Sequence, residues 1–140
     1  MLPKVWIVAV TFSIPFSIIN FNAYLKGNSP SAVQVICSSI FVLLWLISGF
    51  IAGYKERKDF LIAATAYWLV VILLLFLGYY AEIDIIFIPS ALIFAGPLYG
   101  LKYFIGNQPD MMLTVYSIGI IYIGIVSGYG VGILYRLFRR

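Results

Sequence analysis

Apolar residues in this chain gather into five long blocks that short polar connectors separate. The blocks cover residues 5–24, 33–53, 60–80, 85–105 and 111–135. Each has roughly 20 residues or more, the length that an α-helix needs to cross about 30 Å of hydrocarbon. They are too long and too uniformly apolar for barrel strands, and lipid tolerates no other open backbone. The pattern therefore predicts an all-α, polytopic integral membrane helix bundle with five hydrophobic segments.

The connectors carry residues that typically start helices. Ser29 is placed to cap the second helix, and Asp59 and Asp84 are placed to cap the third and fourth. Asp110 precedes the fifth block, where a carboxylate is favourable against the helix dipole. Because these acids and Glu82 lie in or beside turns, we expect them to have structural rather than catalytic roles.

The fourth block differs from the other four in its helix breakers. Pro89 and Pro97 interrupt it, and Gly96 and Gly100 loosen it further. It is nevertheless apolar and long enough to span, and neighbours can satisfy the carbonyls that a proline frees. The sequence leaves two topologies open: four spans plus an irregular or re-entrant fourth segment, or five spans.

The distribution of lysine and arginine favours the first topology, since these residues concentrate on the cytoplasmic side. With a cytoplasmic N-terminus and five spans, five basic residues lie inside and four outside. If the fourth block instead enters and leaves on the outer side, seven lie inside and two outside. Both versions place Lys4 and residues 55–58 in the cytoplasm.

We read the chain as a single transmembrane domain over residues 1–140. The first block has a basic flank, as a signal peptide does, but Phe21 stands where a cleavage site needs a small residue two positions before Ala23. We therefore expect this block to be a retained span. The compact design points to a prokaryotic plasma membrane.

Glycines recur at helical spacing in the fifth block. Gly124, Gly128 and Gly132 are four residues apart and share one helix face, and Gly49 and Gly53 repeat the pattern in the second block. Small residues let two helix backbones approach closely. This glycine zipper has two interpretations: packing within the chain, or a contact with a second copy or with a larger membrane protein.

Polar residues form a second pattern. Ser13, Ser17 and Asn20 share a face of the first block, and Gln34 and Ser38 share a face of the second. Such groups avoid lipid, because burying an unpaired amide costs a few kcal/mol. One interpretation is that the first, second and fifth helices meet at the centre through hydrogen bonds while the third faces lipid. The other is a polar groove for a small solute or a lipid headgroup.

Composition narrows the chemistry. The chain is 64% hydrophobic and 10% charged, against about 25% charged in a typical soluble domain. Its net charge of +4 comes from basic residues at block ends, which indicates lipid headgroups rather than nucleic acid. It has no histidine and one cysteine, Cys37, and no block has a charge near its middle. We therefore expect no enzyme activity, metal, cofactor or proton-coupled transport.

The preferred function from sequence is a small, multi-pass, non-enzymatic accessory or assembly subunit. Its partners would be the lipid bilayer and either a second copy of the chain or a larger membrane protein. The alternative is a small passive transporter or channel for a small solute or a lipid, which would use the polar stripes.

Overall fold

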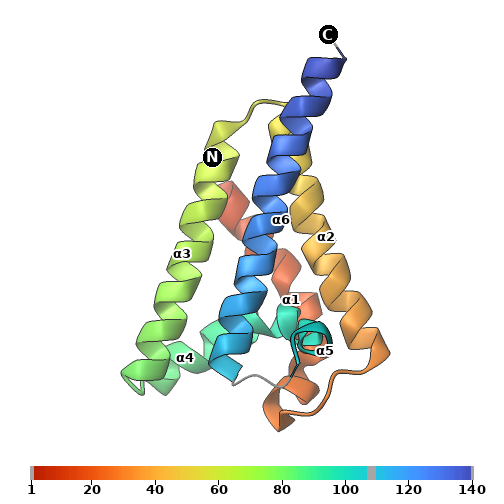
Figure 1. Ribbon diagram of the computed structural model, residues 1–140. Helices are drawn as coiled ribbons and strands as arrows, with labels where there is room; N and C mark the ends of the chain where they lie inside the picture. Colours follow the sequence, from red (N-terminus) through yellow and green to blue (C-terminus); the bar gives the residue numbers. More distant parts are fainter. Residues whose placement is uncertain (1, 107–109, 140) are drawn as a thin grey trace.

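The computed structural model of the protein describes residues 2–106 and 110–139, and these residues form helices and short connections without a strand (Figure 1). The long helices are α1 (Leu2–Lys26), α2 (Ala32–Tyr54), α3 (Lys58–Tyr80) and α6 (Asp110–Phe138). Between α3 and α6 lie α4 (Asp84–Ser90), a π-helical turn η1 (Ala91–Ala95), a 3₁₀ turn η2 (Gly96–Leu101) and α5 (Lys102–Ile105). By length and composition, five stretches are suited to cross a membrane: the four long helices and residues 84–105 taken together.

The four long helices alternate in direction in the order α1, α2, α3 and α6, so that α2 and α6 run parallel to each other (Figure 1). Gly49 of α2 lies against Ile125 of α6, and Gly53 lies against Tyr129 four residues further along both helices. Both chain termini consequently lie at the end of the bundle where α2 passes into α3 (Figure 1). We call this the termini end, and we call the opposite end, where α1 passes into α2, the loop end.

Residues 84–105, here called the transverse segment, run across the lower part of the bundle in Figure 1 instead of along it. The segment starts just after α3, with Phe87 packed on Gly78. It finishes beside the α1–α2 connection, where the Lys102 ammonium donates to the Gly27 carbonyl at 3.2 Å. Both of its ends therefore lie at the loop end.

The prolines explain why this segment is irregular. Pro89 and Pro97 have no N–H, so neither closes the bond to the carbonyl four residues before it. Between and around the prolines the backbone forms a π-helical turn over Ala91–Ala95 and a tighter 3₁₀ turn over Gly96–Leu101. Such changes of helix type leave backbone groups that need partners from elsewhere.

The burial pattern corrects the arrangement expected from sequence. In the most apolar 18 residues of each stretch, half are buried in the transverse segment but only 17% in α1. The first helix is thus peripheral. The third is not purely outward-facing, because Tyr67 and Trp68 pack against Trp45 of α2 with ring centres 5.9 and 5.5 Å away. A side-chain pattern cannot reveal that a proline-broken segment occupies the centre.

Three helix starts also differ from expectation. The N-cap of α2 is Ser31, which forms a reciprocal capping box with Gln34, so Ser29 lies outside the helix. Lys58 already begins α3, which places Asp59 in the first turn. Asp84 is the first residue of α4 and not its cap. The side chain of Asp110 lies outside the described residues.

Candidate functional site

The predicted glycine positions lie mainly in the contact between α2 and α6. A Cβ atom on Gly49 would collide with the Ile125 carbonyl, and one on Gly53 would collide with the Tyr129 carbonyl. On the other helix, a Cβ on Gly128 would collide with the Leu46 carbonyl. We call this contact the glycine seam. It brings the two backbones together within one chain.

The two other predicted glycines of α6, Gly132 and Gly124, differ in whether they belong to the seam. Gly132 belongs to the seam, because a Cβ there would collide with the Phe50 carbonyl. Gly124 does not, since the nearest atom to its added Cβ is the Leu46 Cβ at 3.9 Å, an ordinary contact. Sequence spacing puts all three on one face, but only the backbone approach distinguishes the positions where a side chain is excluded.

The polar stripe of α1 faces the transverse segment. The Ser17 hydroxyl donates to the Leu92 carbonyl at 2.5 Å, and it lies 3.4 Å from the Ile93 carbonyl, which Pro97 leaves without its helical partner. The Asn20 amide donates to the Gly96 carbonyl at 2.9 Å. These side chains replace hydrogen bonds that the broken helix lacks.

Helix α2 contributes the other half of this arrangement. The Ser38 hydroxyl accepts from the Gly100 N–H at 2.9 Å and from the Asn20 amide at 3.2 Å. Asn20 and Ser38 are fully buried. The transverse segment is therefore held from both sides by a connected polar network.

Two other candidate residues lie apart from this network. The Ser13 hydroxyl is buried and donates to the Ala9 carbonyl of its own helix at 2.9 Å. The Gln34 side chain donates to the Ile19 carbonyl at 3.2 Å and also accepts from the Ser31 N–H in the capping box. The five residues therefore do not line one open groove in this structure, because the backbone of the transverse segment occupies the space between the stripes.

Some buried polar atoms in the interior remain without a hydrogen-bond partner among the described residues. They include the Asn20 Oδ1 atom and the Ser117 hydroxyl of α6. Buried polar atoms normally have a partner, and ordered water commonly fills that role. The network around Asn20 thus has unused acceptor capacity.

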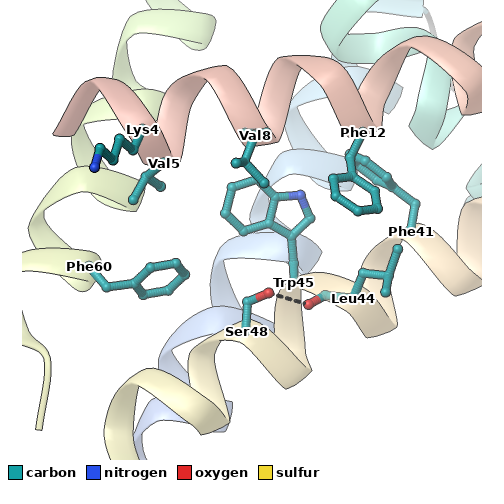
Figure 2. A pocket seen from close by; sticks show the side chains of 10 residues that line it. Lys4, Val5, Val8, Phe12, Phe41, Leu44, Trp45, Ser48 and Phe60 are labelled. Atoms are coloured by element: carbon teal, nitrogen blue, oxygen red, sulfur yellow. Dashed lines mark hydrogen bonds between the residues drawn. The ribbon is translucent and has the colours of Figure 1, made fainter. Parts of the chain in front are cut away.

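Sequence reasoning missed a cavity of about 330 Å³ beside α1 (Figure 2). We call it the α1–α2 groove. Its long walls are Val5, Val8 and Phe12 from α1 and Phe41, Leu44 and Trp45 from α2. Helical spacing puts each trio on one face, but it gives no sign that the two faces stand apart.

The acidic residues gather into no site. Glu82 lies in the turn after α3 with a φ of 54°, and Asp84 begins α4. Over residues 2–106 and 110–139, no group of three His, Cys, Asp or Glu side chains is placed to hold a metal ion. Cys37 is a partly buried free thiol.

Comparison of the chain with protein-family models, with curated proteins and with solved structures finds no match. Any statement about function therefore rests on the geometry described above.

Proposed function

We propose that the protein crosses a prokaryotic plasma membrane four times, through α1, α2, α3 and α6, and that the transverse segment is re-entrant from the loop end. The four helices have 23 to 29 residues, about 35 to 44 Å at 1.5 Å per residue, which suits a bilayer. The position of the transverse segment supports this topology, because both of its ends lie at the loop end.

Charge supports an orientation with both termini in the cytoplasm. Six of the eight basic residues in the described ranges belong to the termini end, and only Lys26 and Lys102 belong to the loop end. Arg136 near the end of α6 pairs with Glu56 in the turn after α2, so these two basic segments lie side by side. The excess of cations at one end is the pattern that the positive-inside rule requires of the cytoplasmic side.

Within this topology we propose a non-enzymatic accessory or assembly subunit that acts through its outer surface. The observation that carries the proposal is the closed interior: Ser17, Asn20 and Ser38 all bond inward to the transverse segment. The glycine seam is likewise directed inward. A partner or a second copy would therefore contact the outer helix faces and not the glycines.

Site-specific photo-crosslinking combined with native mass spectrometry in a mild detergent tests this role. A photoreactive residue replaces Ile123, which is 66% exposed on α6, or Leu73, which is 59% exposed on α3. Ile121 is fully buried on α6 and provides the matched control position. We expect one outer position to give a discrete crosslinked protein and a stoichiometric complex, while Ile121 gives neither. A monomer that forms no protein crosslink from either outer face would refute the subunit role.

Passive transport of a small solute is the second candidate, and one observation favours it. Stretches of 3₁₀ and π-helix within a helix are frequent at functional sites, and here they contact Asn20, whose Oδ1 atom has no hydrogen-bond partner among the described residues. Broken segments at membrane depth also bind solutes in many transporters. Purified protein in liposomes should then conduct a solute, and Asn20→Leu should reduce its flux without changing the protein's helix content. The absence of flux for every solute tested on the wild type would eliminate this candidate.

A further inference from the structure

The α1–α2 groove has the dimensions of a site for one hydrocarbon chain. Its volume of about 330 Å³ lies within the range of small-ligand pockets. Along α1 it extends from Lys4 to Phe12, a rise of eight residue steps, or about 12 Å at 1.5 Å per step. One leaflet of hydrocarbon is about 15 Å deep, half of a 30 Å core. The groove thus follows the depth of one leaflet from the termini end inward.

The lining of the groove is apolar along its length. Figure 2 shows the Trp45 ring beneath Val8, with Phe12 at one end and Phe60 of α3 near the other. Ser48 is the exception, but its hydroxyl donates to the Leu44 carbonyl of its own helix at 2.7 Å. The walls therefore offer contact to methylene groups and little to a polar solute.

Charge enters the groove only at the termini end. Lys4 lies at that end of the α1 wall, and its side chain forms no ion pair with any residue that the structure describes (Figure 2). Lys55 and Lys58 belong to the same end of the bundle, in and just after the α2–α3 turn. An apolar trough with cations at one mouth is complementary to a lipid with a negative headgroup.

We infer that the α1–α2 groove binds one acyl chain of an anionic phospholipid from the leaflet at the termini end, with the Lys4 ammonium against the headgroup phosphate. This site goes beyond the proposed subunit role and rests only on the membrane insertion included in that proposal. The affinity is expected to come from buried methylene groups, and the selectivity from the cationic mouth.

Lipid titration of the delipidated protein, followed by native mass spectrometry in detergent, tests the charge part. The probes are phosphatidylglycerol and phosphatidylcholine with identical acyl chains. We expect phosphatidylglycerol to bind more tightly than phosphatidylcholine. Lys4→Gln should weaken phosphatidylglycerol binding about fivefold, the effect of roughly one cation near an anionic surface. Lys26→Gln, at the other end of α1, is the matched control and should leave binding unchanged. Equal binding of both lipids by the wild type would overturn the proposal.

Filling the groove tests its position. Val8→Phe with Ser48→Phe narrows it from both walls, whereas Ile7→Phe with Ile47→Phe introduces the same two side chains at positions that do not line it. We expect the first pair to weaken phosphatidylglycerol binding about tenfold and the second pair to leave it unchanged. Equal binding by the two double variants would overturn the assignment. Should the first pair fail to fold, the Lys4→Gln comparison decides.

Quenching of tryptophan fluorescence by a brominated acyl chain gives an independent readout of the same site. Trp45 lines the groove, so phosphatidylglycerol with a brominated chain should quench the wild type at low molar ratio, in excess phosphatidylcholine. The quenching should decline in Trp45→Phe and in the filled variant, and persist in the control pair. A filled variant that forms fewer dimers but keeps full quenching would instead identify a second copy as the occupant and contradict the lipid site.

Discussion

The glycine seam and the contacts of the transverse segment are two different solutions for bringing backbone against backbone in an apolar interior. Along the seam, α2 and α6 are regular helices whose N–H and C=O groups are bonded within each helix. Close approach of the two backbones therefore requires only that no side chain stands between them. Gly53 and Gly128 meet this requirement, because they have no side chain. Close approach then provides van der Waals contact and weak Cα–H bonds.

The transverse segment has the opposite problem, because its helix is broken. Pro97 leaves the Ile93 carbonyl without a helical donor, and the turns around it leave further backbone groups in need of partners. Side chains of α1 and α2 supply these partners, with Asn20 and Ser38 at the centre. A regular helix thus needs only a complementary surface to pack closely in an apolar environment. A broken helix also needs polar side chains nearby that satisfy its free backbone groups. Substitutions in the two regions should differ accordingly.

The largest loss of stability is expected in the seam. Gly128→Leu puts a bulky side chain where even a Cβ collides with the Leu46 carbonyl, so α2 and α6 must separate. We expect the free energy of unfolding in detergent to decrease by about 3 kcal/mol, the upper part of the usual range for overpacking. Gly130→Leu is the matched control on the same helix, because a Cβ there meets nothing within 4 Å. Equal losses in the two variants would disprove the seam.

Two glycines of the transverse segment extend the comparison. One of them, Gly100, also lies where a side chain would collide with a neighbouring backbone, as the glycines of the seam do. A Cβ on Gly100 would collide with the Gln34 carbonyl, whereas a Cβ on Gly96 meets its nearest atom, the Ser17 hydroxyl oxygen, at 3.2 Å. We expect Gly100→Ala to lower the unfolding free energy by about 2 kcal/mol and Gly96→Ala by well under half of that. Chemical unfolding of both variants in one detergent makes the comparison, and the reverse order would contradict the described packing.

Removing the polar side chain of Asn20 should lower the free energy of unfolding less than adding a bulky side chain to the seam. Asn20→Leu removes the hydrogen bonds to Ser38 and to the Gly96 carbonyl. Hydrogen bonds within membrane proteins contribute on average about 0.6 kcal/mol and at most about 1.7, so we expect a loss of about 1 to 2 kcal/mol. Asn22 is exposed on the same helix, and Asn22→Leu should change the unfolding free energy little. A loss of 3 kcal/mol or more for Asn20→Leu would contradict this ranking.

The smallest effect is expected at the end of the seam. The Glu56 side chain, 60% exposed, pairs with Arg136, and exposed ion pairs contribute less than about 1 kcal/mol. Arg136→Gln should therefore lower the unfolding free energy by no more than that, and less at high salt. A larger, salt-independent loss would mean that the pair holds α2 and α6 together, contrary to our account.

The sequence could predict the helices and the spacing of the glycines, because apolar length and a four-residue repeat are local signals. It could also predict that Ser17 and Asn20 share a face. It could not predict their partners, since these are backbone groups of a segment more than 70 residues away. The α1–α2 groove was equally hidden, because Val8 and Phe12 have the spacing of a lipid-facing surface whether or not α2 stands apart from them.

The central claim is that residues 84–105 return to the side from which they start, so that both termini share one side of the membrane. Single cysteines replace Ser29, Lys55 or Phe138 in a Cys37→Ser background, and intact cells are treated with an impermeant maleimide. We predict that Ser29→Cys is labelled at once, and that Lys55→Cys and Phe138→Cys are labelled only after permeabilisation. Labelling of Phe138→Cys together with Ser29→Cys in intact cells would mean five full spans and would contradict the account.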